Sequence, residues 1–268
     1  MADRKYAVLI DADNIGSQYI KVIMDEVSKK GIVTIKRIYG DWCNNVISPW
    51  KEVNLEYSIL PVQQYSYTKG KNATDSAMII DAMDLLYTAD IDGFCLVSSD
   101  SDFTRLAARL REAGKDVVGM GKKQTPQPFI KACTDFKYVD VLIEDQEEGS
   151  KKKQKAVKTE PNKDQEINSQ TDVDSIKAAT IQIIEENSDD TGWIGASEIG
   201  AALKKRFSDF DPRNYGYKKL VPLLESFGLE IEKREDPNNI ANPMGQLVYV
   251  KVKKKVGNTK ASGKKNNK

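Results

Sequence analysis

The chain has 268 residues, of which 40% are hydrophobic and 30% are charged, and its formal net charge is +1. This length suits two small domains, and the near-zero net charge excludes a global electrostatic pull toward nucleic acid or a membrane surface. Because the sequence contains no histidine, it excludes Ser-His-Asp and Cys-His nucleophilic systems and zinc sites built on histidine. Any catalysis therefore depends on carboxylates, with a hard metal ion as the expected cofactor.

The cysteines and the apolar runs bear on where the protein resides. Cys43, Cys95 and Cys133 lie far apart without a CxxC pattern, which favours a reducing compartment and predicts a cytoplasmic location. The apolar run after the N-terminus stops at Asp11, too early for a signal peptide. No run of about 18 apolar residues occurs, so we expect no membrane span and no membrane partner.

Residues 1–143 alternate short apolar runs with helical patterns, which predicts a parallel sheet covered by helices. In chain order, strands are expected at 6–10, 32–39, 57–62, 94–97, 117–120 and 138–142. Helices are expected at 17–30, 50–55, 74–89 and 103–113, with Gly31 and Gly114 ending the first and the last of them. The fold class predicted for this part is α/β.

The remaining sequence divides into three parts. Residues 144–172 are polar and rich in lysine, which is typical of a flexible linker. Residues 173–254 carry helical patterns at 176–186, 197–207 and 217–227, followed by strand patterns at 229–232 and 247–252. Three helices and a hairpin predict a small α+β winged-helix domain. Residues 255–268 are basic and are expected to be a disordered tail.

Acidic residues gather where predicted strands end. Asp11, Asp13 and Asn14 follow the first strand, and the run from Ser98 through Asp100 to Asp102 follows the strand at 94–97. The carboxyl ends of parallel strands meet at one edge of a sheet, where binding sites form.

Asp75 opens the helix at 74–89, which one turn of helix would bring to the same edge. Converging carboxylates repel one another and favour a divalent cation, and a site with oxygen ligands only selects Mg²⁺ or Mn²⁺ over zinc. Taken singly, each acid is also explained as a cap or a helix-dipole residue. Asp81 lies six positions after Asp75 and cannot share its helix face, so we expect Asp81 and Asp84 to be surface residues or outer neighbours of the site.

Residues 4–143 resemble the NYN domain, a branch of the PIN-like nucleases. The resemblance is carried by Leu9-Ile10-Asp11-Ala12-Asp13-Asn14, by the helix start at Asp75, and by Val97-Ser98-Ser99-Asp100-Ser101-Asp102-Phe103. It implies that Asp11, Asp75, Asp100 and Asp102 are the metal-binding and catalytic acids of a PIN-like, Rossmannoid nuclease domain. It also implies supporting roles for Asp13, Asn14 and Ser98.

Residues 173–254 resemble the OST-HTH (LOTUS) domain. The resemblance is carried by Gly192-Trp193-Ile194, Ser197-Glu198-Ile199-Gly200 and the segment from Phe210 to Leu220. It implies RNA as the partner, single-stranded or structured, and in some members of the family protein contacts, so a homodimer or a protein partner is a second expectation. The segment interleaves aromatic and basic residues, which makes Arg213, Tyr215, Lys218 and Lys219 candidate RNA contacts. For Trp193 a place in the core is favoured.

The leading hypothesis is an endoribonuclease that hydrolyses phosphodiester bonds with metal-activated water. Lys69, Lys71 and Tyr67, just before the helix at 74–89, are expected to hold the RNA backbone. One alternative is a non-catalytic RNA-binding regulator on a nuclease fold. A second is a phosphatase of the haloacid-dehalogenase kind, because Asp11-Ala12-Asp13 imitates its Asp-x-Asp pair, but that requires a cap module after the first strand.

Overall fold

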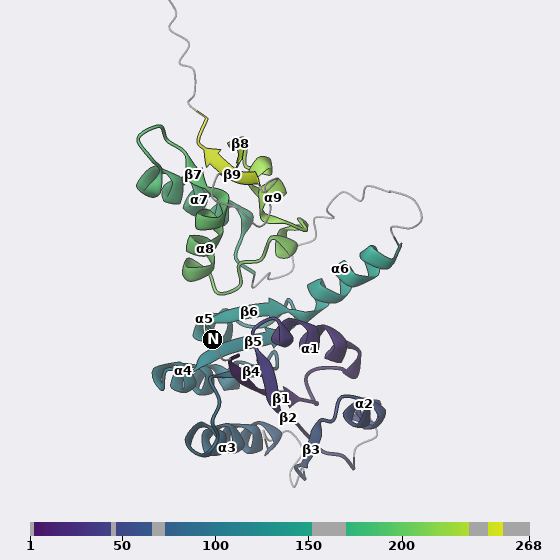
Figure 1. Ribbon diagram of the computed structural model, residues 1–268. Helices are drawn as coiled ribbons and strands as arrows, with labels where there is room; N and C mark the ends of the chain where they lie inside the picture. The colour runs from purple at the N-terminus through teal and green to yellow at the C-terminus, as the bar shows by residue number, and fades with distance from the viewer. Residues whose placement is uncertain (1–2, 44–46, 66–72, 152–169, 236–245, 254–268) are drawn as a thin grey trace, which may run out of the picture. The chain divides into compact units, whose positions relative to one another are not determined.

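The computed structural model describes residues 3–43, 47–65, 73–151, 170–235 and 246–253 (Figure 1). It divides into two compact units, and each is described by itself. Unit 1 comprises Met1–Val173 and Leu203–Lys218, and unit 2 comprises Asp174–Ala202 and Lys219–Lys268. Within the described ranges, no helix is both long enough and apolar enough to cross a membrane.

A six-stranded sheet forms the centre of unit 1, in the order β3-β2-β1-β4-β5-β6. All neighbouring strands pair in parallel, as the strand–helix alternation predicts. The strands β1 and β4 lie at the centre and are buried along almost their whole length, which explains their unbroken apolar sequences. The strands are β1 (Lys5–Asp11), β2 (Ile32–Gly40), β3 (Leu60–Gln63), β4 (Gly93–Val97), β5 (Asp116–Gly121) and β6 (Asp135–Tyr138).

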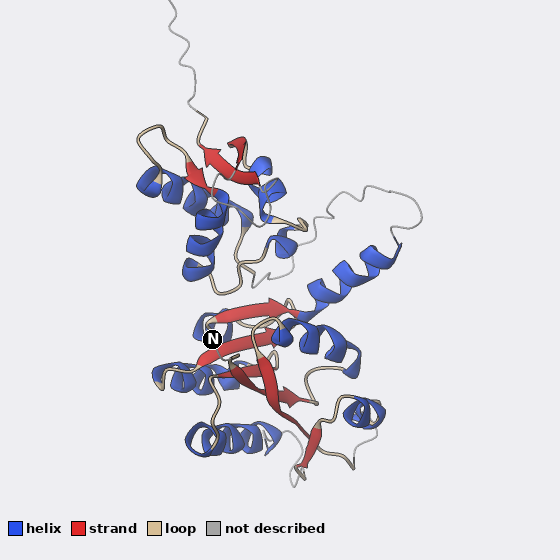
Figure 2. Ribbon diagram, viewed as in Figure 1, coloured by secondary structure: helices blue, strands red, loops and turns tan. Residues whose placement is uncertain are grey.

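Helices cover both faces of this sheet (Figure 2). Alternate side chains of β1 point to opposite faces: Ala7 and Leu9 belong to the core with α3, α4 and α5, whereas Val8 and Ile10 belong to the core with α1 and α2. The helices of unit 1 are α1 (Ile20–Ser28), α2 (Trp50–Glu56), α3 (Ala73–Thr88), α4 (Thr104–Glu112), α5 (Gln127–Ala132) and α6 (Val139–Lys151), with 3-10 turns η1 (Ser17–Tyr19), η3 (Ser101–Phe103) and η4 (Pro212–Tyr215).

Two sequence-based expectations for unit 1 are wrong in detail. The strand predicted at 138–142 ends at Tyr138, and Val139 begins α6. The apolar run there is short and contains β-branched residues, so its periodicity does not separate strand from helix. In addition, α6 continues to Lys151, so the first part of the stretch predicted as linker is helical. The helix α5 was not predicted at all.

Unit 2 contains a three-stranded antiparallel sheet in the order β7-β9-β8. The three predicted helices and the two long predicted strands are present, as expected for a winged-helix domain. The third strand, β7, has two residues, which is too short to leave a pattern in the sequence. The elements of this region are α7 (Val173–Asn187), β7 (Ile194–Gly195), α8 (Ala196–Arg206), α9 (Leu220–Ser226), β8 (Glu230–Glu235) and β9 (Gln246–Lys251).

Candidate metal centre

The acidic runs meet at the carboxyl edge of the central strands. Ile10 of β1 pairs with Val97 of β4, so the residues that follow them, Asp11 and Ser98, are neighbours. The Ser98 hydroxyl donates a hydrogen bond to Asp11 Oδ2 at 2.9 Å. The same hydroxyl oxygen accepts a hydrogen bond from the Asp100 backbone N–H at 3.0 Å. A single buried serine thus joins the end of β1 to the loop after β4.

Three carboxylates converge at this edge. One oxygen each of Asp75, Asp100 and Asp102 lies within 4.8 Å of the other two. Asp75 comes from the first turn of α3, and Asp100 caps η3 by accepting the Asp102 backbone N–H at 2.9 Å. Asp75 and Asp100 are half-buried and Asp102 is exposed. The arrangement leaves the cluster open to solvent while fixing its members from two elements.

Asp11 lies beside this cluster and is 2% exposed. Its Oδ1 accepts hydrogen bonds from the backbone N–H groups of Asp13 and Asn14 at 3.1 and 3.3 Å. Burial raises the pKa of Asp11 to about 7; the Ser98 hydrogen bond opposes this rise, and the charges of Asp75 and Asp13 add to it. Burial also raises the pKa of Asp75 to about 6, together with the charges of Asp100 and Asp102. Burial and neighbouring negative charges thus favour a bound proton or cation at Asp11 and Asp75.

Two further polar residues tie the neighbouring loops together. The exposed Asp13 accepts a hydrogen bond from the Thr74 hydroxyl at 2.8 Å, which links the loop after β1 to the start of α3. The side-chain oxygen of Asn14 accepts the Ser99 backbone N–H at 3.3 Å. Both contacts hold the acid-bearing segments in register with one another.

The chemistry of this edge fits a hard divalent cation. The ligand atoms it offers are carboxylate oxygens, which suit Mg²⁺ or Mn²⁺. Among the described residues, no lysine or arginine forms a salt bridge with Asp11, Asp75 or Asp100, so the described part of the protein supplies no counter-charge for these three acids.

The family model of the NYN domain matches residues 5–142, which is more than half of the sequence. The chain belongs to the NYN domain family. The model of the OST-HTH/LOTUS domain matches residues 172–241. The predicted order, an NYN domain followed by an OST-HTH domain, is therefore confirmed. The NYN domain belongs to the PIN-like nuclease superfamily, and the parallel sheet with flanking helices agrees with that fold. Together the two domains describe a ribonuclease-like, RNA-binding protein.

Solved structures add little beyond this. A protein of unknown function from Vibrio parahaemolyticus is 20% identical, covers 52% of this chain and 94% of its own, and has a TM-score of 0.44. An uncharacterized protein from Nitrosomonas europaea is 28% identical, covers 38% of this chain and 92% of its own, and has a TM-score of 0.27. Likenesses at these TM-scores carry no functional argument. No curated protein matches the chain.

The loop after β1 of the NYN domain bears on the phosphatase alternative. The strand β1 ends at Asp11 and η1 begins at Ser17. This short loop contains no cap module, which the haloacid-dehalogenase reading requires. The Asp-x-Asp pattern at Asp11 and Asp13 therefore lacks the structural context of such a phosphatase.

Asp81 of the NYN domain has partners that the sequence does not reveal. Asp81 was expected to be a surface residue or an outer neighbour of the site. Its half-buried carboxylate accepts hydrogen bonds from the Arg37 guanidinium and the Tyr39 hydroxyl, both on β2. These contacts fasten α3 to the sheet and so fix the helix that carries Asp75. Asp84, by contrast, is exposed.

The predicted RNA contacts have different surroundings. Tyr67, Lys69 and Lys71 lie outside the described residues. Lys218 and Lys219 are exposed.

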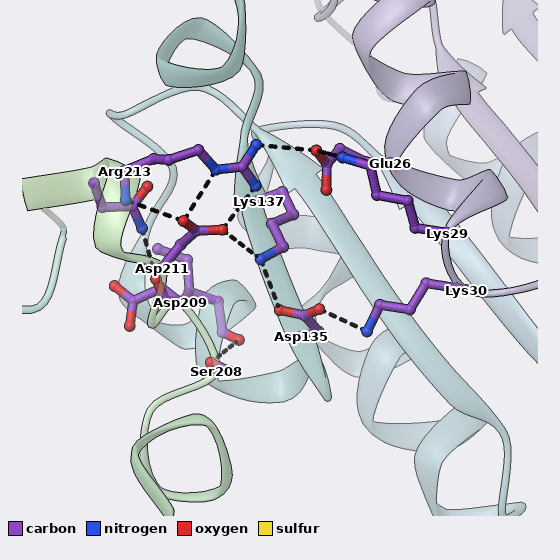
Figure 3. Close-up of polar contacts among 11 residues, drawn as sticks. Glu26, Lys29, Lys30, Asp135, Lys137, Ser208, Asp209, Asp211 and Arg213 are labelled. Atoms are coloured by element: carbon purple, nitrogen blue, oxygen red, sulfur yellow. Dashed lines mark hydrogen bonds and ion pairs between the residues drawn. The ribbon is translucent and has the colours of Figure 1, made fainter. Parts of the chain in front are cut away.

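Arg213 and Tyr215 are engaged within unit 1. The Arg213 guanidinium donates to Asp211 at 3.0 and 2.8 Å and to Glu26 of α1 at 3.1 Å (Figure 3). The Tyr215 hydroxyl donates to the Thr171 carbonyl oxygen at 3.1 Å. These side chains already have protein partners at the positions where RNA contact was expected.

Trp193 of unit 2 is half-buried, although a place in the core was favoured. The Arg234 guanidinium carbon lies 5.2 Å from its ring centroid and 4.4 Å from that of Tyr249. The Lys251 ammonium lies 5.6 Å from the Trp193 ring. These cation–π contacts join β8 and β9 to the segment before β7.

Proposed function

We propose that this protein is a metal-dependent endoribonuclease that hydrolyses RNA phosphodiester bonds. The observation that supports this most directly is the convergence of Asp75, Asp100 and Asp102 within 4.8 Å at the edge of an NYN-family sheet. Asp11 is the proposed fourth ligand, because its buried carboxylate adjoins the cluster. The proposed ion is Mg²⁺ or Mn²⁺.

The protein's own residues have a defined task in this proposal. Ser98 and the backbone N–H groups of Asp13 and Asn14 orient the Asp11 carboxylate. Thr74 and Asp81 anchor the helix that carries Asp75. When bound, a divalent cation supplies an activated water and stabilises charge on a phosphoryl oxygen, and this chemistry requires no histidine.

The OST-HTH domain is proposed to recruit the RNA, through exposed basic residues such as Lys218 and Lys219. Lys69, Lys71 and Tyr67 are proposed to contact the backbone near the acids, since they immediately precede α3 in the sequence. Phosphate contacts of this kind give affinity that is independent of sequence and sensitive to salt.

The decisive experiment compares cleavage of a labelled RNA by the wild type, Asp100→Asn and Asp84→Asn in the presence of Mn²⁺. We expect Asp100→Asn to lose about 100-fold or more in rate, the range found when one charge-stabilising group is removed from an active site. Asp84→Asn removes an exposed acid from the same domain and is expected to cleave normally.

Calorimetric titration with Mn²⁺ provides a second readout, in which Asp100→Asn is expected to bind more weakly. Equal cleavage by wild type and Asp100→Asn would refute the assignment of Asp100. RNA binding without any cleavage by the wild type would instead favour the non-catalytic regulator.

A further inference from the structure

Unit 1 contains a pocket of about 580 Å³ near the amino ends of the strands, whereas the acids lie at the carboxyl ends of the strands. It adjoins the amino end of β6, whereas Asp11 lies at the carboxyl end of β1. Cationic side chains from four parts of unit 1 line it: the end of α1, the end of α4, the end of α5 and the end of α8. These residues are Lys30, Arg111, Lys131, Lys204, Lys205 and Arg206.

The two acids that line the pocket, Asp135 and Asp209, already have partners within the protein. Asp135 forms ion pairs with Lys30 at 2.7 Å and with Lys137 at 3.7 Å (Figure 3). Asp209 accepts hydrogen bonds from the Thr171 backbone and hydroxyl at 2.9 and 2.8 Å, and from the Tyr138 hydroxyl at 3.1 Å. Asp135 is thus paired with two lysines, and the two acids of the lining are outnumbered by its six cationic side chains.

Lys131, Lys204 and Lys205 form no salt bridge with any residue that the structure describes. Lysines at a helix end are favoured by the helix dipole, which accounts for the cations of α5 or of α8 taken separately. The dipole does not explain why these helix ends face one concavity together with Arg111.

The guanidinium of Arg111 is held in place without losing its charge. It donates to the carbonyl oxygens of Lys131 and Ala132, each at 3.2 Å. A fixed guanidinium beside lysines that repel one another is an arrangement that an anion stabilises. The pocket thus has the charge and the oriented donors of a phosphate-binding site.

We infer that this pocket binds the phosphodiester backbone of RNA, at a contact separate from the acidic edge. The inference rests on the proposed function for the choice of RNA over other phosphate compounds. The two edges of the sheet are separated by the length of β4, which is about 16 Å for five residues at about 3.3 Å each. A nucleotide at the acids cannot reach the pocket, but a chain of several nucleotides can occupy both.

The test measures RNA affinity against salt concentration. A fluorescent single-stranded RNA is titrated with protein in EDTA, so that binding is separated from cleavage. Log K falls as log salt rises, and each lost phosphate contact lowers the magnitude of this slope by about 0.7. We expect the variant Lys131→Ala/Lys204→Ala to lower the slope by about 1.4, and Lys131→Arg/Lys204→Arg to retain it.

The matched control is Lys21→Ala/Lys51→Ala, which removes the same charge from exposed positions away from the pocket. Its slope is expected to equal that of the wild type. An unchanged slope in Lys131→Ala/Lys204→Ala would overturn the inference even if RNA is cleaved. Binding of inorganic pyrophosphate to the pocket with no contribution to RNA affinity would overturn the assignment to RNA. A lowered slope in a protein that cleaves nothing would sustain the pocket and refute the nuclease proposal.

Discussion

Asp11 and Asp211 are both buried, at 2% and 8% exposure, yet their surroundings act on them in opposite directions. Burial raises the pKa of Asp11 to about 7. Burial would raise the pKa of Asp211 as well, but the Arg213 hydrogen bond and the charge of Lys137 outweigh it and hold the pKa well below its ordinary value. The difference teaches that burial alone does not decide the state of a carboxyl group; the supply of cations does.

The surroundings of Asp211 and those of Asp11 therefore differ in whether the protein itself supplies the counter-charge. Asp211 carries its counter-charges within the fold, since Lys137 and Arg213 both contact it (Figure 3). Asp11 and Asp75 form no salt bridge with any residue in the described ranges. The first region is a structural ion cluster, and the second is the one that an added cation would stabilise.

The largest expected effect comes from removing a cation from the ion cluster around Asp211. Replacing Lys137→Ala leaves the buried Asp211 with only Arg213 and Asp135 with only Lys30, and losing a buried hydrogen bond to a charged group costs about 3 kcal/mol. Urea unfolding followed by circular dichroism measures this loss. Lys21→Ala removes an exposed lysine and is expected to change stability by no more than about 0.5 kcal/mol. A similarly small change for Lys137→Ala would show that the Lys137–Asp211 ion pair does not stabilise the fold.

The next largest effect is the pH dependence of stability that Asp11 and Asp75 produce. The folded-state pKa values of Asp11 and Asp75 are raised, so the folded protein binds more protons than the unfolded chain between about pH 4 and pH 7. The stability of the metal-free protein is therefore expected to fall as pH rises through this window.

Mg²⁺ competes with those protons, so it is expected to stabilise the protein more at pH 8 than at pH 5. At a concentration 100 times the Kd, the gain is about 2.7 kcal/mol. Thermal unfolding with Mg²⁺, against potassium chloride at equal ionic strength, measures it. An equal gain at both pH values would contradict the role given to these carboxylates.

The smallest effect concerns Ser98, which orients the acids without being one of them. Ser98→Ala removes the hydroxyl that donates to Asp11 and accepts from the Asp100 N–H. Loss of such a supporting hydrogen bond lowers metal affinity about 10-fold, or about 1.4 kcal/mol. Calorimetric titration with Mn²⁺ measures it, and Ser101→Ala serves as the exposed control. If both variants bind alike, Ser98 has no orienting role.

Much of the acidic edge was accessible from sequence because it depends on local rules. Asp11 ends an apolar strand and Ser98 follows another, and parallel strands place such residues at one edge. The helical period also separated Asp75 from Asp81 correctly, since only Asp75 joins the cluster. What the period could not give is the partner of Asp81, because Arg37 and Tyr39 lie more than forty positions earlier.

The ion cluster around Asp211, which includes Lys137 of β6 and Arg213, could not be predicted from the sequence for the same reason. Glu26 and Arg213 are 187 positions apart, and no local pattern predicts that pairing. Arg213 was instead interpreted from its neighbours, as a basic residue among aromatic ones. The strand predicted to end at Leu142 failed for a different reason, since a short apolar run has no period long enough to distinguish helix from strand.

The segment from Leu203 to Lys218 belongs to unit 1 although most of its sequence neighbours belong to unit 2. It accepts hydrogen bonds from β6: the Phe136 N–H donates to the Ser208 carbonyl oxygen at 2.7 Å, and the Lys137 ammonium donates to Asp211 Oδ2 at 2.8 Å. Truncating the protein after α6 would thus yield an NYN-domain fragment with an open sheet edge, prone to self-association. Supplying residues 203–218 in trans is the corresponding remedy.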